Sequence, residues 1–436
     1  MSKYYLFGIK GAGMSALAQL LYDHNHEVRG CDFEKEYYTT KGLHARNIQV
    51  DSIENAKIPK DYLVIVGNAF VNHERVEELR KQKYWLRTYS EFLGDLSRSY
   101  QSIAISGSHG KTTTTNMCRQ VLERLEPVNF IVGDGVGGGN PLSDLFVFEA
   151  CEYKRHFLFY EPKVAVITNI DFDHPDYYRD IYDVVDAFKH FIDQSDFIIY
   201  NGEDPHLRDL LVARKKKVSV GLSQEQDIYA QNITFENNHT RFDAYYKGRF
   251  YGTMTLPLFG THNVLNSLLA IALGIYFGVN RIDIQEALEH YITSERRFQI
   301  FETPDQIIIS DYAHHPVEIR ATYESLTWKY NNRQLIAIFE PHTFSRTKAF
   351  MKEFIESLEL YDEVYLADIF TSVREKEGTV TIEAFANAID GGKILKDVNV
   401  LREKKNAVLV FMGAGTIDQT ANAYYQSVME EKGLTK

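Results

Sequence analysis

Cysteine is scarce in this sequence, with only three residues in a chain of 436. Cys31, Cys118 and Cys151 are odd in number and far apart, so they do not suggest the disulfide framework that is typical of small secreted proteins. We interpret them as reduced thiols. The ten prolines are also scattered, and no proline-rich linker divides the chain.

Long apolar runs are missing as well. No stretch approaches the roughly 18 apolar residues that a membrane-spanning helix needs. The first residues, MSKYYLFGIKGAG, lead almost directly into a strand and a glycine turn. A signal peptide would have a basic segment, an apolar run and a cleavage site of small residues, and this sequence of features is not found here. We therefore expect a cytoplasmic protein with no membrane partner.

Basic residues are outnumbered, because 48 Lys and Arg face 60 Asp and Glu, which gives a net charge of -12. A protein whose main task is to bind nucleic acid or an anionic membrane needs a basic face, so neither partner is expected. Any anionic substrate must be held by locally placed Lys, Arg and backbone N–H groups. The length predicts two or three domains.

Three α/β segments follow one another along the chain. Residues 1–97 contain strand, glycine turn, helix and strand in sequence, which predicts a small doubly wound domain. Residues 98–295 contain buried strands that end in polar residues, an alternating stretch that predicts β-hairpins, and an apolar helix at 261–278. Residues 296–436 form another strand and helix series, which predicts a third domain.

The first glycine turn holds Gly8, Gly11 and Gly13 between a predicted strand and helix. Such a turn lets the backbone approach a diphosphate, which the N–H groups at the helix start then bind. Asp32, about 20 residues further on, stands where a ribose hydroxyl is bound in dinucleotide sites. The turn suits NAD or a UDP-sugar, and it could equally be a purely structural turn.

The second glycine turn reads GSHGKT and is two residues shorter than a Walker A loop. It nevertheless keeps an apolar strand before it and a helix after it. Gly107 and Gly110 give backbone access, Lys111 suits the β- and γ-phosphates, and Thr112 suits Mg²⁺. We predict an ATP site here rather than a chance G-K-T in a loop.

Polar side chains end the next two predicted strands. Glu149 and Glu152 close one of them, and Asn169, Asp171, Asp173 and His174 follow the other. Because parallel sheets bind ligands at the carboxyl ends of their strands, these groups predict a magnesium site beside the phosphate loop. Exposed loop acids would explain the same composition.

The third segment carries Arg296 and Arg297, then Asp311 with His314 and His315. Further along, EPHTFSRT adds His342 and Arg346. Arginine binds phosphate or carboxylate with two parallel hydrogen bonds, although a surface pair is often merely solvated. The adjacent histidines favour substrate contacts or structural hydrogen bonds over zinc, because no third ligand stands at a zinc spacing.

Seven motifs in order resemble the Mur ligases of peptidoglycan synthesis: GSHGKTTTT, FEACEYKRHFL, TNIDFDHPDYY, THNVLNSLLA, RRF, DYAHHPVEI and EPHTFSRT. The resemblance covers essentially the whole chain. It implies an α/β fold of three domains, with a Rossmann-like N-terminal domain, a central P-loop ATPase-like domain with added β-hairpins, and a Rossmann-like C-terminal domain. These would bind the UDP-sugar, bind ATP, and close over both, respectively.

The resemblance is greatest to members that join L-alanine to UDP-N-acetylmuramate. It implies ATP as a substrate, Mg²⁺ (or Mn²⁺) as the metal, and an acyl phosphate intermediate. The expected partners are these small molecules, in a monomer or weak homodimer. One rival is a recycling ligase that attaches an intact peptide to the same sugar, and more distant rivals are an NAD-dependent oxidoreductase and a regulatory nucleotide-binding protein.

The resemblance also implies roles for individual residues. The expected catalytic residues are Lys111, His174, Arg297, His342 and Arg346. The expected ATP-binding residues are Gly107, Ser108, His109, Gly110, Lys111, Thr112, Thr113, Asn263, Arg297 and Asp311. The expected UDP-sugar-binding residues are Gly11, Ala12, Gly13, Met14, Asp32, Asn68 and Ser90. The expected metal ligands are Thr112, Glu149 and His174.

Three positions depart from the family pattern. Lys10 replaces a common glycine of the first turn, FEACEY replaces the more acidic E-A-D-E-S, and Thr416 stands where Asp often follows GAG. The second departure leaves open whether Glu152 or Asp173 also contacts a metal. No carbamylated lysine is expected.

Overall fold

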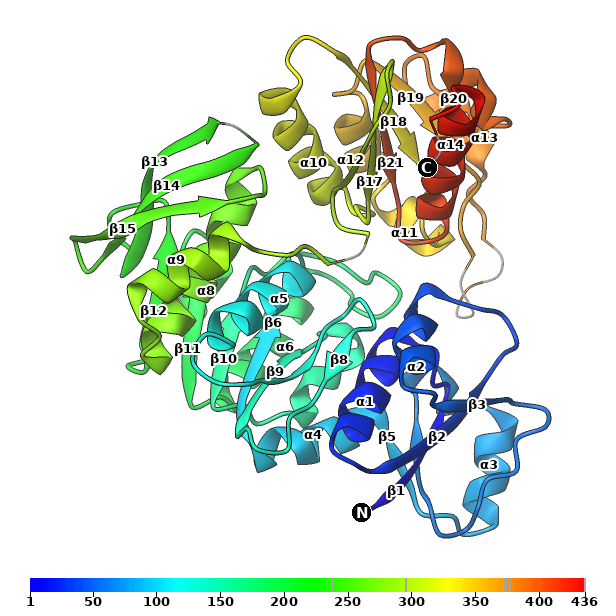
Figure 1. Cartoon of the computed structure of the whole chain (residues 1–436), viewed down its shortest axis with the longest axis vertical. Helices are drawn as coiled ribbons and strands as arrows, with labels where there is room; N and C mark the ends of the chain where they lie inside the picture. The colour runs from blue at the N-terminus through cyan, green and yellow to red at the C-terminus, as the bar shows by residue number, and fades with distance from the viewer. Residues whose placement is uncertain (237, 295, 372–374, 376–377, 435–436) are drawn as a thin grey trace.

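The computed structural model describes residues 1–436 except 237, 295, 372–374, 376–377 and 435–436. Three sheets follow one another along the chain, and each lies within one of the three predicted segments (Figure 1). The exact domain boundaries stay predictions, since α4 (Tyr89–Ser99) runs across residue 97 and residue 295 lies outside the described part. The predicted three-domain α/β fold is confirmed.

The N-terminal sheet has five parallel strands in the order β3-β2-β1-β4-β5. The strands are β1 (Lys3–Phe7), β2 (Glu27–Asp32), β3 (Gln49–Ser52), β4 (Leu63–Val66) and β5 (Leu86–Thr88). They alternate with α1 (Ala12–Asp23), η1 (Tyr38–Thr40), α2 (Lys41–Ala45), η2 (Asn68–Phe70), α3 (Glu74–Lys81) and α4. The strand order reverses between β1 and β4, so the first glycine turn lies at the point where doubly wound sheets bind nucleotides.

The central sheet has ten strands in the order β15-β14-β13-β12-β11-β10-β6-β9-β7-β8. They are β6 (Gln101–Ser106), β7 (Asn129–Ile131), β8 (Gly137–Gly138), β9 (Leu145–Glu149), β10 (Val164–Ile167), β11 (Phe197–Asn201), β12 (Lys217–Gly221), β13 (Ile228–Glu236), β14 (His239–Tyr246) and β15 (Arg249–Leu256). Strands β6 and β9 to β12 are parallel and buried, whereas β13 to β15 pair antiparallel, which confirms the predicted hairpins.

The helices of the central domain are α5 (Lys111–Leu122), η3 (Tyr153–Phe159), α6 (Ile181–Asp193), α7 (Pro205–Leu211), α8 (Thr261–Phe277) and α9 (Arg281–Glu289). Helix α8 is buried along most of its length and packs beside α5, because Gly274 leaves room for Val121 and Ile284. This packing fixes the helix that follows the phosphate loop.

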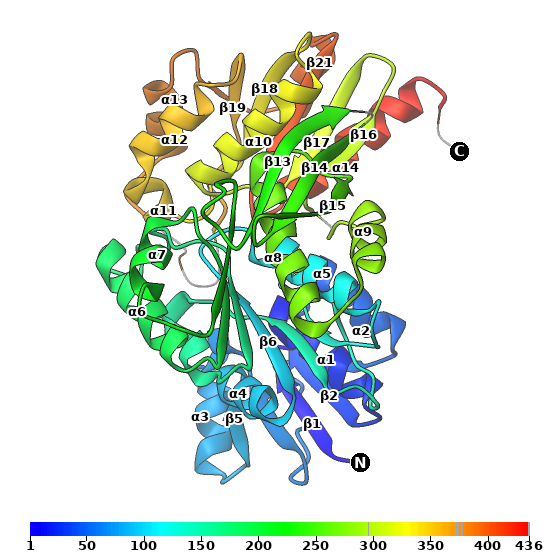
Figure 2. The ribbon, with the colours of Figure 1, turned by 90° about the vertical axis from the view of Figure 1, so that its left-hand side faces the viewer.

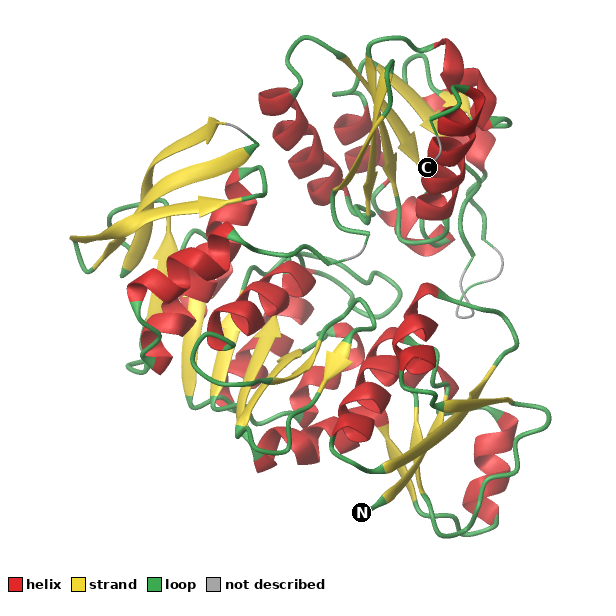
Figure 3. Cartoon of the chain, in the orientation of Figure 1, coloured by secondary structure: helices red, strands yellow, loops and turns green. Residues whose placement is uncertain are grey.

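The C-terminal sheet has six strands in the order β16-β17-β21-β18-β19-β20, antiparallel only between β16 and β17. The strands are β16 (Gln299–Glu302), β17 (Gln306–Asp311), β18 (Gln334–Phe339), β19 (Glu363–Leu366), β20 (Lys393–Ile394) and β21 (Ala407–Met412). Its helices are α10 (Pro316–Lys329), α11 (Phe344–Ala349), α12 (Met351–Leu358), α13 (Ile382–Ala388), η4 (Val398–Glu403) and α14 (Ile417–Glu431). Helices cover both faces of this sheet (Figure 3).

The N-terminal and central domains meet where the β7–β8 loop lies on α1. Gln19 donates a hydrogen bond from Nε2 to the Gly135 carbonyl at 2.7 Å, and the Gly139 N–H donates to Asp23 at 3.2 Å. A side chain at Gly137 would overlap the Ala16 carbonyl oxygen, so only glycine permits this approach. On the other side of the molecule, β13 reaches α10 of the C-terminal domain (Figure 2). Among the described residues, no helix is both long enough and apolar enough to cross a membrane.

Candidate active site

The short phosphate loop spans the end of β6 and the start of α5. Gly107 and Gly110 have left-handed φ angles of +138° and +80°, and a side chain at Gly107 would overlap the Thr168 hydroxyl. Asn169, which follows β10, supports the loop, because its carbonyl accepts a hydrogen bond from the Ser108 N–H at 3.1 Å. The loop is therefore complete and is backed by the neighbouring strand.

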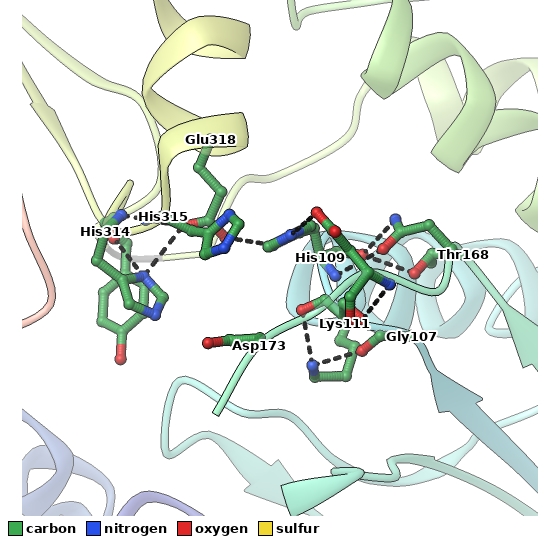
Figure 4. Close-up of polar contacts among 12 residues, drawn as sticks. Gly107, His109, Lys111, Thr168, Asp173, His314, His315 and Glu318 are labelled. Atoms are coloured by element: carbon green, nitrogen blue, oxygen red, sulfur yellow. Dashed lines mark hydrogen bonds and ion pairs between the residues drawn. The ribbon is translucent and has the colours of Figure 1, made fainter. Parts of the chain in front are cut away.

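Lys111 curls back over this loop (Figure 4). Its Nζ donates to the carbonyls of Gly107 and Ser108 at 2.5 and 3.0 Å, and it lies 2.9 Å from a carboxylate oxygen of Glu152. Burial alone lowers the pKa of Lys111, but Glu152 and its neighbours outweigh burial and raise it. Lys111 thus stays cationic at the start of α5, where the helix dipole also favours an anion.

Thr112, in the first turn of α5, and Glu149, at the carboxyl end of β9, lie side by side. The Thr112 hydroxyl donates to Glu149 Oε2 at 2.8 Å and accepts from Arg297 at 3.3 Å. Burial raises the pKa of Glu149, against the opposing effects of Lys111 and the Thr112 hydroxyl. Carboxylate and hydroxyl oxygens are ligands that Mg²⁺ prefers, so this pair fits a magnesium ion. The third predicted ligand, His174, lies with Nε2 at 3.5 Å from Glu152.

A cavity of about 340 Å³ opens between the central and C-terminal domains. It is lined by six of the predicted ATP-binding residues: His109, Gly110, Thr113, Asn263, Arg297 and Asp311. The Asn263 side chain donates to the Phe259 carbonyl at 2.7 Å, and Asp311 accepts from the Thr322 hydroxyl at 2.7 Å. Each of these two side chains, predicted to contact the nucleotide, is thus oriented by a hydrogen bond within its own domain.

A second cavity, of about 170 Å³, lies where all three domains meet. The predicted residues on its walls are Ser108, Gly110, Lys111, Thr112, Glu149, His174 and Arg297. Sequence reasoning gave no role to six others on these walls: Tyr38, Gly133, Asp134, Cys151, Tyr312 and Glu318. Cys151, Tyr312 and Glu318 lie within motifs that were recognised, whereas no local pattern marks Tyr38, Gly133 and Asp134, which only the fold brings to this cavity. We call this cavity the reaction chamber.

His109 joins the phosphate loop to the C-terminal domain. Its Nε2 lies 3.1 Å from Asp171 and its Nδ1 lies 3.5 Å from Glu318 of α10 (Figure 4). Burial lowers the pKa of His109, but the two carboxylates outweigh burial and raise the pKa to about 9. At neutral pH the His109 imidazolium therefore forms an ion pair with Asp171 and a second one, across the domain boundary, with Glu318.

The adjacent histidines take part in the same contact. His314 lies 3.0 Å from Glu318, and the His315 ring packs against the His109 ring at an interplanar angle of 37°, with 4.5 Å between ring centroids. Burial, and then the His109 cation, lower the pKa of His315. Both rings thus belong to the junction between the domains.

His342 lies just before helix α11 of the C-terminal domain, and Arg346 lies within that helix. Arg346 is buried and donates from Nη2 and Nε to one oxygen of Asp173, at 2.7 and 3.1 Å. Although burial opposes it, the Arg346 guanidinium holds the pKa of Asp173 well below its usual range. The His342 ring stacks on Phe370 and lies edge-on to His314, with 6.1 Å between the imidazole centroids.

The predicted UDP-sugar residues gather at the carboxyl edge of the N-terminal sheet. Gly11, Ala12, Gly13 and Met14 start α1, with Gly11 as its N-cap. Asn68 and Ser90, which follow β4 and β5, form a hydrogen bond at 3.1 Å. Asp32 is buried at the end of β2, and its oxygens accept from the N–H groups of Lys10 and Phe33 at 2.7 and 2.8 Å. Its contact with a ribose stays a prediction.

Comparison with known families covers nearly the whole chain. Residues 3–101 match the Mur ligase family catalytic domain, residues 105–274 the Mur ligase middle domain, and residues 296–416 the Mur ligase glutamate ligase domain. The chain belongs to the Mur ligase family. These ATP-dependent ligases act in peptidoglycan synthesis on small-molecule substrates, with ATP and Mg²⁺.

Solved structures of other Mur ligases share the fold of this one. UDP-N-acetylmuramate-alanine ligase from Thermotoga maritima is 25% identical, with a TM-score of 0.83 over 99% of this chain and 100% of that chain. A murein peptide ligase from Psychrobacter arcticus is 22% identical, with a TM-score of 0.72 over 98% and 99%. MurF from Acinetobacter baumannii is 17% identical, with a TM-score of 0.66 over 97% and 93%.

Proposed function

We propose that this Mur ligase joins L-alanine to UDP-N-acetylmuramate at the expense of ATP, in the cytoplasm. The single observation that carries the proposal is the reaction chamber, where Lys111 and the Thr112–Glu149 pair meet residues of the other two domains. The full-length similarity to the Thermotoga maritima alanine ligase supports the choice of substrates.

Each domain has a proposed task. Residues 1–97 bind the UDP-sugar through Gly11, Ala12, Gly13, Met14, Asn68 and Ser90, with Asp32 organising their turn. Residues 98–295 bind ATP phosphates at the loop Gly107 to Thr113. Residues 296–436 bind the amino acid and complete the adenosine cavity with Arg297 and Asp311, opposite Asn263. A monomer or weak homodimer suffices, because one chain supplies every group.

In the first step, a carboxylate oxygen of the muramoyl group attacks the γ-phosphorus of ATP, and ADP leaves. Lys111 stabilises the negative charge on the phosphoryl group as it moves, and Arg297, beside Thr112, adds a second cation. Thr112 and Glu149, with His174 nearby, would hold Mg²⁺, which supplies further charge neutralisation at the phosphates. No enzyme nucleophile is needed, since the substrate carboxylate is one.

In the second step, the amine of alanine attacks the acyl phosphate carbon, and phosphate leaves from the tetrahedral intermediate. The new C–N bond replaces the C–O bond to phosphate. The ammonium loses one proton to solvent before the attack and a second to the departing phosphate, so the amide nitrogen keeps one hydrogen. We assign His342 and Arg346 to the side where the amino acid arrives, because they contact His314 and Asp173, which line the chamber. Positioning supplies most of the rate enhancement in such a reaction.

The rivals differ in one observable each. A recycling ligase would use an intact tripeptide instead of alanine. An oxidoreductase would bind NADH tightly at the first glycine turn, and it would leave Lys111 and the reaction chamber without a task.

The experiment measures phosphate release with Mg-ATP and UDP-N-acetylmuramate while the amine is varied over amino acids and a tripeptide. We expect release only when both the sugar and an amine are present, fastest with L-alanine. Mass spectrometry should show one alanyl residue added to the sugar nucleotide. Turnover of the tripeptide alone would replace the alanine assignment by the recycling activity, and tight NADH binding by fluorescence would support the oxidoreductase.

A further inference from the structure

Tyr38 extends from the N-terminal domain into the reaction chamber, and its own segment is fastened to the first glycine turn. Thr39 donates a short hydrogen bond from its hydroxyl to the Lys10 carbonyl, and Ser15 of α1 donates to the Thr39 carbonyl at 2.7 Å. The backbone of η1 therefore follows the turn at which the diphosphate of a UDP-sugar is proposed to bind.

Lys10 strengthens this connection from within the turn. Its ammonium is buried and donates to the carbonyls of Phe33 and Lys35 at 3.0 and 2.9 Å, and it pairs with Glu36 at 3.1 Å. Glu36 in turn accepts from the Thr40 hydroxyl at 2.8 Å. The segment that carries Tyr38 is thus tied to the turn on both sides, and a glycine at position 10 could not do this.

At its other end, Tyr38 meets a cation of the C-terminal domain. The Arg296 guanidinium lies between two aromatic rings, 4.8 Å from the Tyr38 centroid and 5.1 Å from the Tyr312 centroid. Arg296 is 7% exposed and donates to the Gly415 carbonyl at 2.7 Å, with Asp418 at 3.3 Å. Such a buried cation–π contact is among the stronger ones. Arg296 is therefore fixed to the start of α14 while it contacts the N-terminal domain.

We propose that Tyr38 is a positioning residue that couples the UDP-sugar site to the placement of the C-terminal domain. An anion bound at the first turn stabilises the turn and, through Lys10 and Thr39, the placement of η1, so that Tyr38 holds Arg296 and the chamber wall beside the ATP site. This inference rests on the proposed function, since it takes the turn as the sugar site. The coupling means that bound UDP-sugar tightens the binding of Mg-nucleotide. Because linkage is reciprocal, Mg-nucleotide must tighten the binding of the sugar by the same factor.

The test measures the affinity of UDP-N-acetylmuramate by calorimetry, with and without Mg²⁺ and a non-hydrolysable ATP analogue. We expect the analogue to tighten sugar binding in the wild type. Tyr38→Ala should weaken this tightening by about 3- to 30-fold, in line with the loss of a buried cation–π contact. Tyr38→Phe keeps the ring and should retain most of it. The matched control is Tyr37→Ala, because the adjacent Tyr37 is exposed and contacts Lys35 instead.

Arg296→Lys changes the cation of the same contact. It keeps the positive charge but removes the planar guanidinium that lies against the Tyr38 ring. It should lose the coupling as Tyr38→Ala does, and the double variant should lose no more than either single variant. If Tyr38→Ala and Arg296→Lys keep the wild-type coupling, or if Tyr37→Ala loses as much, the inference is wrong while the proposed function stands. If the wild type binds no UDP-N-acetylmuramate at all, the proposed function itself fails.

Discussion

Replacing Lys111 by methionine is expected to slow ligation by about 10²- to 10³-fold, because the moving phosphoryl group loses its principal cation. The Lys111 ammonium lies on the phosphate loop, between the Gly107 carbonyl and Glu152. Among the described contacts, no other ammonium group lies on this loop. Binding of UDP-N-acetylmuramate should remain nearly unchanged, since its proposed site belongs to another domain. Single-turnover phosphate release and calorimetry measure the two quantities.

The control for Lys111→Met concerns Glu152, which is buried and pairs with Lys111. Removing one partner of a buried pair destabilises a protein by about 3–5 kcal/mol in general, although His174 can partly compensate here. The double variant K111M/E152Q removes the uncompensated charge and should regain stability without regaining activity. Lys189→Met, at an exposed position of α6, should behave as the wild type. If Lys111→Met loses the binding of UDP-N-acetylmuramate as well as turnover, the assignment of separate sites is contradicted.

Replacing Glu149 by glutamine is expected to raise the Mg²⁺ concentration for half-maximal activity by at least about tenfold, and to slow turnover at saturating Mg²⁺. The amide keeps the size of the side chain and can still bond the Thr112 hydroxyl, but it no longer offers a charged oxygen to the cation. Activity as a function of Mg²⁺ and direct titration of Mn²⁺ by electron paramagnetic resonance both report the change.

A matched control for Glu149→Gln is Glu126→Gln, which removes a carboxylate from the exposed segment after α5. It should leave the Mg²⁺ dependence unchanged. An unchanged Mn²⁺ affinity in Glu149→Gln would show that the metal is held elsewhere, with Glu152, Asp173 and His174 as the next candidates.

The long strands and helices were predictable from the sequence because their apolar patterns are strong. Strand β10 is buried at all four of its residues and helix α8 along most of its length, and their apolar composition shows it. Strands β3 (Gln49–Ser52) and β20 (Lys393–Ile394) carry no such signal, since they are short, contain polar residues and are partly exposed. Their pairing depends on neighbours that are distant in the sequence.

The local parts of the candidate site were predictable in the same way, whereas its interdomain contacts were not. The phosphate loop is one continuous motif, so Lys111 and Thr112 could be named from spacing alone. The pairs His109–Glu318 and Arg346–Asp173 join residues far apart in the chain, and the sequence gives no pattern that links them. For Asp173, which the motif offered as a possible metal ligand, the structure shows a buried partner in Arg346. The short phosphate loop is supported by Asn169, which follows β10 and accepts a hydrogen bond from the Ser108 N–H.

The most direct measurement of the central claim follows oxygen from the substrate carboxylate. UDP-N-acetylmuramate labelled with ¹⁸O in the muramoyl carboxylate is turned over with Mg-ATP and L-alanine, and the inorganic phosphate is analysed by mass spectrometry. An acyl phosphate intermediate transfers one labelled oxygen to each phosphate released, and this is the predicted result. Phosphate that carries no label while the alanyl product accumulates would contradict the account.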